Sequence, residues 1–90
     1  MSYFRCKLHG QNFSQQPNGH AVDVNFYAVR WVEALTDDHA VERAIEIVTR
    51  QIEENGIRRP KNSEATLEVE DVEEVDAEAY KPNSDSFIFY

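Results

Sequence analysis

Three histidines and one cysteine are the residues of this chain best suited to bind a metal or to act as a catalytic base or nucleophile. His9, His20 and His39 are far apart, and none stands at the spacing of a metal-binding motif such as HExxH. Cys6 and His9 lie in a segment that alternates like a strand, so their side chains should point to opposite faces. The sequence therefore predicts neither a metal site nor a thiolate–imidazole pair.

Carboxylates are dense in the segment 68–78, and paired acids can act as general acid and base or bind a cation. The acidic residues are Glu68, Glu70, Asp71, Glu73, Glu74, Asp76 and Glu78. On a strand such side chains point alternately to opposite faces, so they do not easily gather the roughly six to eight oxygens that calcium takes. The serines lack a GxSxG elbow, and the glycines form no phosphate-binding loop. We predict an exposed acidic surface, with no catalytic residue, cofactor or metal.

A row of apolar side chains in the segment 22–35 suggests binding to another protein. The sequence VDVNFYAVRWVEAL is rich in β-branched and aromatic residues and lacks Gly and Pro, which predicts one long strand. Its even positions are mostly apolar, with Arg30 as the interruption, and its odd positions bring Tyr27, Val29 and Trp31 together. Both faces are therefore apolar at the middle, whereas one helix is available to cover them. We expect these three odd-numbered side chains to form an interface with a second copy of the chain.

Two further elements are predicted before this strand. Residues 3–9 alternate between apolar and polar types, so we predict a half-buried strand whose outer face is cationic through Arg5 and Lys7. Residues 10–20 contain two glycines and a Pro-Asn-Gly turn signal and are predicted to be a loop, with Phe13 turned back onto the core.

An amphipathic helix is predicted after the long strand. Thr36 and the two aspartates that follow it can accept the free N–H groups of the first turn and suit the helix dipole. Asn55-Gly56 should end the helix, with Ile57 folded back on its last turn. Apolar residues at spacings of three and four form its buried stripe: Val41, Ala44, Ile45, Val48 and Ile52.

The last third of the chain predicts two more strands. Leu67 and Val69 alternate with polar residues, and the phase then slips by one position. A β-bulge near Glu70–Asp71 would absorb the slip, and a short helix within residues 70–79 is the rival interpretation. A Lys-Pro-Asn-Ser turn then leads into a short strand over residues 86–90, which offers a second way to cover the apolar face of the long strand.

The order of elements is β-β-α-β-β. It predicts an α+β fold, a four-stranded sheet with one amphipathic helix packed on one face, as a single domain over residues 1–90. Arg5 and Lys7 would pair well with Glu68 and Glu70 on an adjacent strand, which favours placing the first strand beside the third.

Composition narrows the possible functions. The net charge of -8 repels phosphate, which argues against a nucleic-acid or anionic-membrane binder. No run approaches the ~18 apolar residues of a membrane span. Cys6 is the one cysteine, which rules out an internal disulfide, and we expect a cytoplasmic protein.

We therefore expect a small acidic interaction module that is homodimeric and not an enzyme. The alternative is an acidic inhibitor, of the immunity-protein or antitoxin type, whose carboxylates cover the basic active site of a nuclease or toxin. A small dimeric enzyme with a pocket between helix and sheet is a third interpretation, supported only by unassigned His and Tyr residues. Aromatics beside Arg5 and Lys7 would suit base stacking, but the motif of an RNA-recognition sheet is absent.

Overall fold

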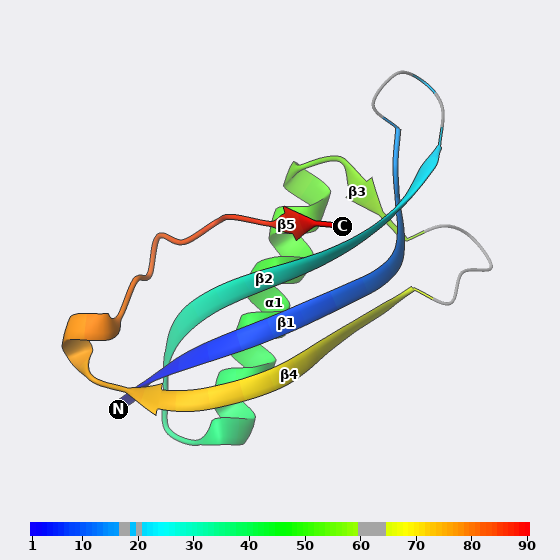
Figure 1. The fold of residues 1–90 in the computed structure, drawn as a ribbon. Coiled ribbons are helices and arrows are strands. Elements are labelled where there is room, and N and C mark those ends of the chain that lie inside the picture. The colour runs from blue at the N-terminus through cyan, green and yellow to red at the C-terminus, as the bar shows by residue number, and fades with distance from the viewer. Residues whose placement is uncertain (17–18, 20, 60–64) are drawn as a thin grey trace.

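A computed structural model shows one helix packed on a five-stranded antiparallel sheet (Figure 1). The structure describes residues 1–16, 19, 21–59 and 65–90. The elements are β1 (Ser2–Gln15), β2 (Val22–Ala34), α1 (Asp37–Glu54), β3 (Ile57–Arg58), β4 (Thr66–Val75), the 3-10 helix η1 (Ala77–Ala79) and β5 (Ile88–Phe89). The predicted α+β class is confirmed. Pro17, Asn18 and His20, which fall in the predicted loop, lie outside the described residues.

The strand β1 lies at the centre of the sheet. The order is β3-β1-β2-β5, and β4 also pairs with β1. β3 and β4 lie along the same edge of β1, because β3 pairs with its last two residues and β4 with the stretch before them. β4 pairs with β1, so the predicted placement of the first strand beside the acidic strand is confirmed. The register differs from the predicted one, because Arg5 and Lys7 lie opposite Glu73 and Asp71. Of the two predicted carboxylates, only Glu70 lies near a lysine or arginine among the described residues, 3.9 Å from Nζ of Lys7.

The sheet has five strands where four were predicted. The additional strand is β3, which forms because Ile57 folds back after the helix, as expected, and then pairs with Gln15. Ile57 is almost completely buried, so burial of its side chain stabilises this short pairing. The predicted strand over residues 86–90 is shorter in the structure, where β5 comprises Ile88 and Phe89.

The prediction of a loop from residue 10 onward is wrong in part, because β1 continues through this stretch. One extra residue of β1 is taken up between Gly10 and Phe13, where Asn12 adopts a φ of 62°. The backbone N–H of Asn12 donates to Oδ1 of Asn25 on β2 over 3.1 Å. This bulge returns Phe13 to the helix side of the sheet, where it is fully buried as expected.

A second bulge lies in β4, where the sequence predicted one. Asp71 and Val69 pair with consecutive residues of β1, so that Glu70 between them is the extra residue. The alternative prediction, a short helix within residues 70–79, holds only for the end of this range. The strand β4 continues to Val75, and the 3-10 helix η1 follows it.

The helix α1 begins and ends as predicted. The hydroxyl of Thr36 accepts a hydrogen bond from the backbone N–H of His39 over 3.2 Å, and Asn55 occupies the C-terminal cap. The fully buried row of the helix consists of Ala40, Ala44, Val48 and Ile52. Val41 and Ile45, which the predicted stripe also contained, are half-buried. The helix is therefore rotated slightly from the predicted orientation.

Cys6 is fully buried in the hydrophobic core between the sheet and α1, and its Sγ lies 3.9 Å from the carbonyl oxygen of Ala40. Burial, reinforced by the charge of Asp71, raises the pKa of the Cys6 thiol to about 11. At pH 8 only about one thiol in a thousand is then a thiolate, the form that reacts.

We expect iodoacetamide to alkylate native Cys6 at pH 8 at least about 100-fold more slowly than the urea-unfolded chain, as followed by mass spectrometry. Because the folded state holds the thiol proton more tightly than the unfolded chain does, the Cys6 thiol stabilises the fold. This contribution is complete below about pH 8.5, the ordinary pKa of a thiol. It is lost as the pH rises through about 11. Equal alkylation rates in the native and unfolded chains would contradict the buried thiol.

Candidate interaction face and C-terminal segment

The face of the sheet that points away from α1, which we call the open face, carries the predicted interface residues. Tyr27, Val29 and Trp31 lie on it, and each is half-buried. Their neighbours along β2 point to the helix side and are buried: Phe26, Ala28, Arg30 and Val32. Each interface residue has a partner in register on β1, in the pairs His9–Tyr27, Lys7–Val29 and Arg5–Trp31. The open face thus has an apolar row on β2 beside a row of basic side chains on β1.

His9 is the centre of a polar and aromatic cluster on the open face. Its Nδ1 lies 3.1 Å from a carboxylate oxygen of Glu70, and its Nε2 forms a hydrogen bond with the hydroxyl of Tyr90. The imidazole stacks on Tyr27 with 4.5 Å between ring centroids, and Tyr90 lies 5.2 Å from Tyr27. Glu70 is the bulged residue of β4, and its carboxylate also lies 3.9 Å from Nζ of Lys7.

The order carboxylate, imidazole, hydroxyl in this cluster is that of an activated nucleophile. The pKa of Tyr90 argues against that role, because desolvation, and then the neighbouring Tyr27, raises it. A nucleophile needs the opposite shift, toward the phenolate. The cluster instead fixes the end of the chain on the open face, where the backbone N–H of Tyr90 also donates to the carbonyl of Asn25.

Residues 80–90, which we call the C-terminal segment, touch the open face at both ends. The ring of Tyr80 packs on Tyr3 with 4.6 Å between centroids, and Nζ of Lys81 lies 5.5 Å from the ring centroid of Trp31. Ile88, in register with Tyr27, is 64% exposed, and Tyr90 is 62% exposed. The segment therefore covers part of the open face, as the alternative prediction held, and adds apolar surface of its own.

Arg30 lies on the other side of β2 and is only 2% exposed. Its Nε donates to Oε1 of Gln51 over 2.7 Å, and its Nη1 donates to the carbonyls of Val29 and Ser86 over 2.7 Å and 2.9 Å. The guanidinium also lies 5.1 Å from the ring centroid of Phe87. Burial lowers the pKa of Arg30, and the charge of Asp85 partly opposes this. Arg30 thus connects the helix, β2 and the C-terminal segment.

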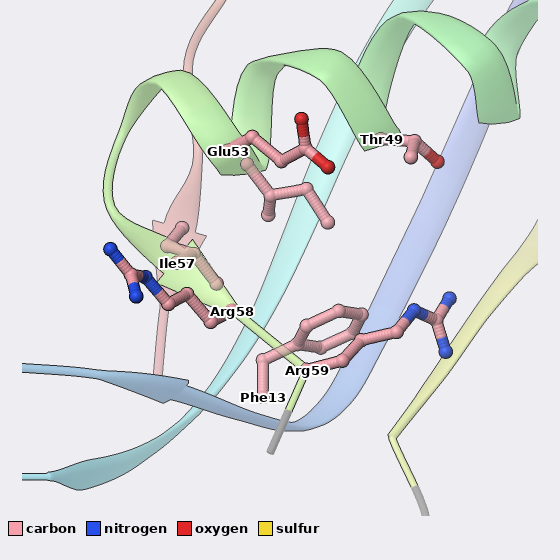
Figure 2. Close-up of a pocket in the computed structure, with 7 residues that line it drawn as sticks. Phe13, Thr49, Glu53, Ile57, Arg58 and Arg59 are labelled. Carbon is pink, nitrogen blue, oxygen red and sulfur yellow. The ribbon is translucent and has the colours of Figure 1, made fainter. Parts of the chain in front are cut away.

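A cavity of about 400 Å³ lies between the end of α1 and β3 (Figure 2). It is lined by Phe13, Thr49, Ile52, Glu53, Ile57, Arg58 and Arg59. The two guanidinium groups point in opposite directions, so they do not converge on one anion. Arg59 instead lies 5.2 Å from the ring centroid of Phe13 and donates to the carbonyl of Ala65 over 2.9 Å. The groups at this cavity are therefore used mainly in packing within the chain.

Sequence reasoning placed Tyr27, Val29 and Trp31 together on one face of the sheet and missed the groups around them. The structure brings Tyr27, Val29 and Trp31 together, whereas the roles of His9 and Tyr90 were not predicted. One signal was available for Glu70, because the phase slip that predicts the bulge also changes where its carboxylate points.

Neither known protein families, nor curated proteins, nor solved structures include a match to this chain. In the part of the chain that the structure describes, no helix is long and apolar enough to cross a membrane. Within the same residues, no group of three or more His, Cys, Asp or Glu side chains could hold a metal ion.

Proposed function

We propose that this protein is a small, non-enzymatic interaction module that works in the cytoplasm as a homodimer joined through the open face. The apolar row of Tyr27, Val29 and Trp31 carries the proposal, and the exposed side chains of Ile88 and Tyr90 extend it across β2 and β5. Charged side chains of β1 and β4 border this row, in the arrangement of apolar centre and polar rim that interfaces use. A single cysteine fits a reducing compartment.

A second copy is the proposed partner because the open face offers both signs of charge in adjacent rows. Arg5 and Lys7 of β1 lie opposite Glu73 and Asp71 of β4. A two-fold axis brings the same patch of both copies together. If the two copies are offset by the width of one strand, the cations on β1 of one copy lie over the carboxylates on β4 of the other. Pairing through the outer edge of β4 is less suitable, because its exposed carboxylates would repel those of a second copy.

We expect the protein to be a dimer at micromolar concentration and a Trp31→Lys variant to be a folded monomer. Large aromatic side chains anchor interfaces, and loss of one typically raises the dissociation constant by about 30-fold or more. Light scattering over a concentration series gives the oligomeric state, and circular dichroism checks the fold.

Leu35→Lys is the matched control, since it also replaces an exposed apolar side chain by a cation, but beyond the end of β2. This variant should remain dimeric. A monomeric wild-type protein would exclude the homodimer, and unfolding of Trp31→Lys would place Trp31 among the residues that stabilise the monomer.

The acidic inhibitor remains a second candidate because of β4. All five acidic residues of this strand are exposed: Glu68, Glu70, Asp71, Glu73 and Glu74. Among the described residues, only Glu70 of these five forms an ion pair. The other carboxylates would suit a basic partner, whose association would be fast and sensitive to salt. A monomeric wild-type protein whose capture of a basic nuclease is reversed by salt would favour this function over the dimer.

A further inference from the structure

The outer edge of β2 is only partly used by the rest of the chain. Its inner edge pairs with β1 over nearly the whole strand, whereas on its outer edge, among the described residues, only Phe26 and Tyr27 pair with β5. The C-terminal segment runs beside this edge on its way from η1 to β5 (Figure 1). Exposed backbone groups at a sheet edge are a template for an added strand.

Arg30 lies beneath this edge with one nitrogen unsatisfied. Its Nε and Nη1 are bonded to Gln51, Val29 and Ser86, but its buried Nη2 has no hydrogen-bond partner among the described residues. An unpaired buried donor on a charged group is costly. The C-terminal segment already supplies one acceptor to this guanidinium, the carbonyl of Ser86, so a chain lying along the edge is in a position to supply another.

Residues 85–90 fit the edge only in part. Phe87 and Phe89 pack edge-on against Phe26, with 5.1 Å and 6.2 Å between ring centroids, and Ile88 points to the open face beside Tyr27. Phe89 is nevertheless 47% exposed and Ile88 64% exposed, and the strand is two residues long. The segment thus alternates between aromatic side chains that contact Phe26 and side chains that point to the open face, but it buries little of its own apolar surface.

We propose that the outer edge of β2 above Arg30 is a docking site for an extended peptide of a partner protein, which adds a strand to the sheet, and that residues 85–90 occupy the site as an internal ligand. The peptide would carry a carboxylate followed at the second and fourth positions by aromatic side chains. Main-chain hydrogen bonds to β2 would provide affinity, and the alternate side chains would provide specificity.

The carboxylate follows from the position of Asp85. Asp85 precedes Phe87 by two residues, so in an extended peptide both side chains point to the same side of the strand, toward Arg30. Its charge acts on the guanidinium, as the pKa of Arg30 shows, but no hydrogen bond joins the two in the described structure. A glutamate at this position is longer by one methylene, and we expect its carboxylate to accept a charge-assisted hydrogen bond from Nη2.

The test measures the binding of a fluorescein-labelled peptide, ESFIFY, to the full-length protein by polarisation. An occupied site lowers the apparent affinity by the fraction of molecules in which it is free. We therefore expect binding to a Phe89→Ser variant, whose internal ligand is weakened, to be at least about tenfold tighter than binding to the wild type. Tyr90→Ala, which removes the contact with His9, is a second variant that should behave in the same way.

A QSFIFY peptide is the matched control, and it should bind Phe89→Ser about tenfold more weakly than ESFIFY, because it offers Arg30 no charge. In a double variant that combines Phe89→Ser with Arg30→Met, the two peptides should bind with equal affinity. Equal affinities of the two peptides for Phe89→Ser, or no saturable binding to either variant, would refute the docking site. Equal binding of the native DSFIFY sequence would overturn the assignment to a partner protein and indicate exchange of the segment between copies. Ile88 and Tyr90 also extend the proposed dimer interface, so both variants affect that surface as well. The comparison of ESFIFY with QSFIFY on one variant does not depend on the homodimer, because the two peptides differ only at the position that faces Arg30.

Discussion

A Val48→Asp substitution is expected to unfold the protein or leave it barely stable. Val48 is fully buried at the middle of the row through which α1 packs on the sheet, between Ala44 and Ile52. A carboxylate at this position would be enclosed by apolar side chains, with a cost of about 4 kcal/mol or more. The whole free energy of unfolding of a domain this small is only about 5–15 kcal/mol.

Thr49→Asp is the matched control, because it introduces the same side chain at the next residue, which is exposed. It should change the free energy of unfolding by less than about 1 kcal/mol. Urea titration followed by circular dichroism compares the two variants. A Val48→Asp protein with the wild-type midpoint would show that α1 does not pack through this row.

The helix could be predicted well because its signals are local. The apolar spacing and both caps lie within some twenty consecutive residues, and each is a property of the helix itself. The rotation that buries Ala40 more deeply than Val41 was not predictable in this way. It depends on how the helix crosses a twisted sheet, which no local pattern specifies.

The two β-bulges differ in how clearly the sequence indicates them. Around Glu70, apolar residues on both sides mark the phase of alternation, so the slip can be read from the sequence. Around Asn12, the preceding inward position is Gly10, which has no side chain to mark the phase. Two glycines and the polar residues between them then indicate a loop, although β1 continues to pair through this region.

The surroundings of Tyr27, Val29 and Trp31, the predicted interface residues, depend on residues that are far apart in the chain. His9 and Tyr90 are separated by 81 positions, and Arg30 and Ser86 by 56. Arg30 attracted notice in the sequence only as a charge on an apolar face. Its partners could not be inferred before the course of the C-terminal segment was known, because that segment contacts the long strand mainly through side chains and two residue pairs.

The contact between Gly10 and Phe26 leads to the second large expected effect. Gly10 is buried at the position where β1 faces Phe26 of β2, and the aromatic ring lies over the glycine backbone. A Cβ atom added to Gly10 would lie 2.3 Å from Cζ and 2.4 Å from Cε1 of Phe26. The ring has little room to move, because Phe13 and Phe87 pack on it with centroid distances of 5.4 Å and 5.1 Å.

We therefore expect Gly10→Ala to lower the free energy of unfolding by about 3 kcal/mol, and the melting temperature by roughly 12–24 °C. Gly56→Asn is the control, because nothing lies within 4 Å of that position and Asn tolerates its positive φ. A double-mutant cycle identifies the cause. In a Phe26→Leu background the smaller side chain leaves space for the added methyl group, so Gly10→Ala should cost at least about 1 kcal/mol less than in the wild type. An equal cost in both backgrounds would mean that the Phe26 ring is not what requires glycine at this position of β1.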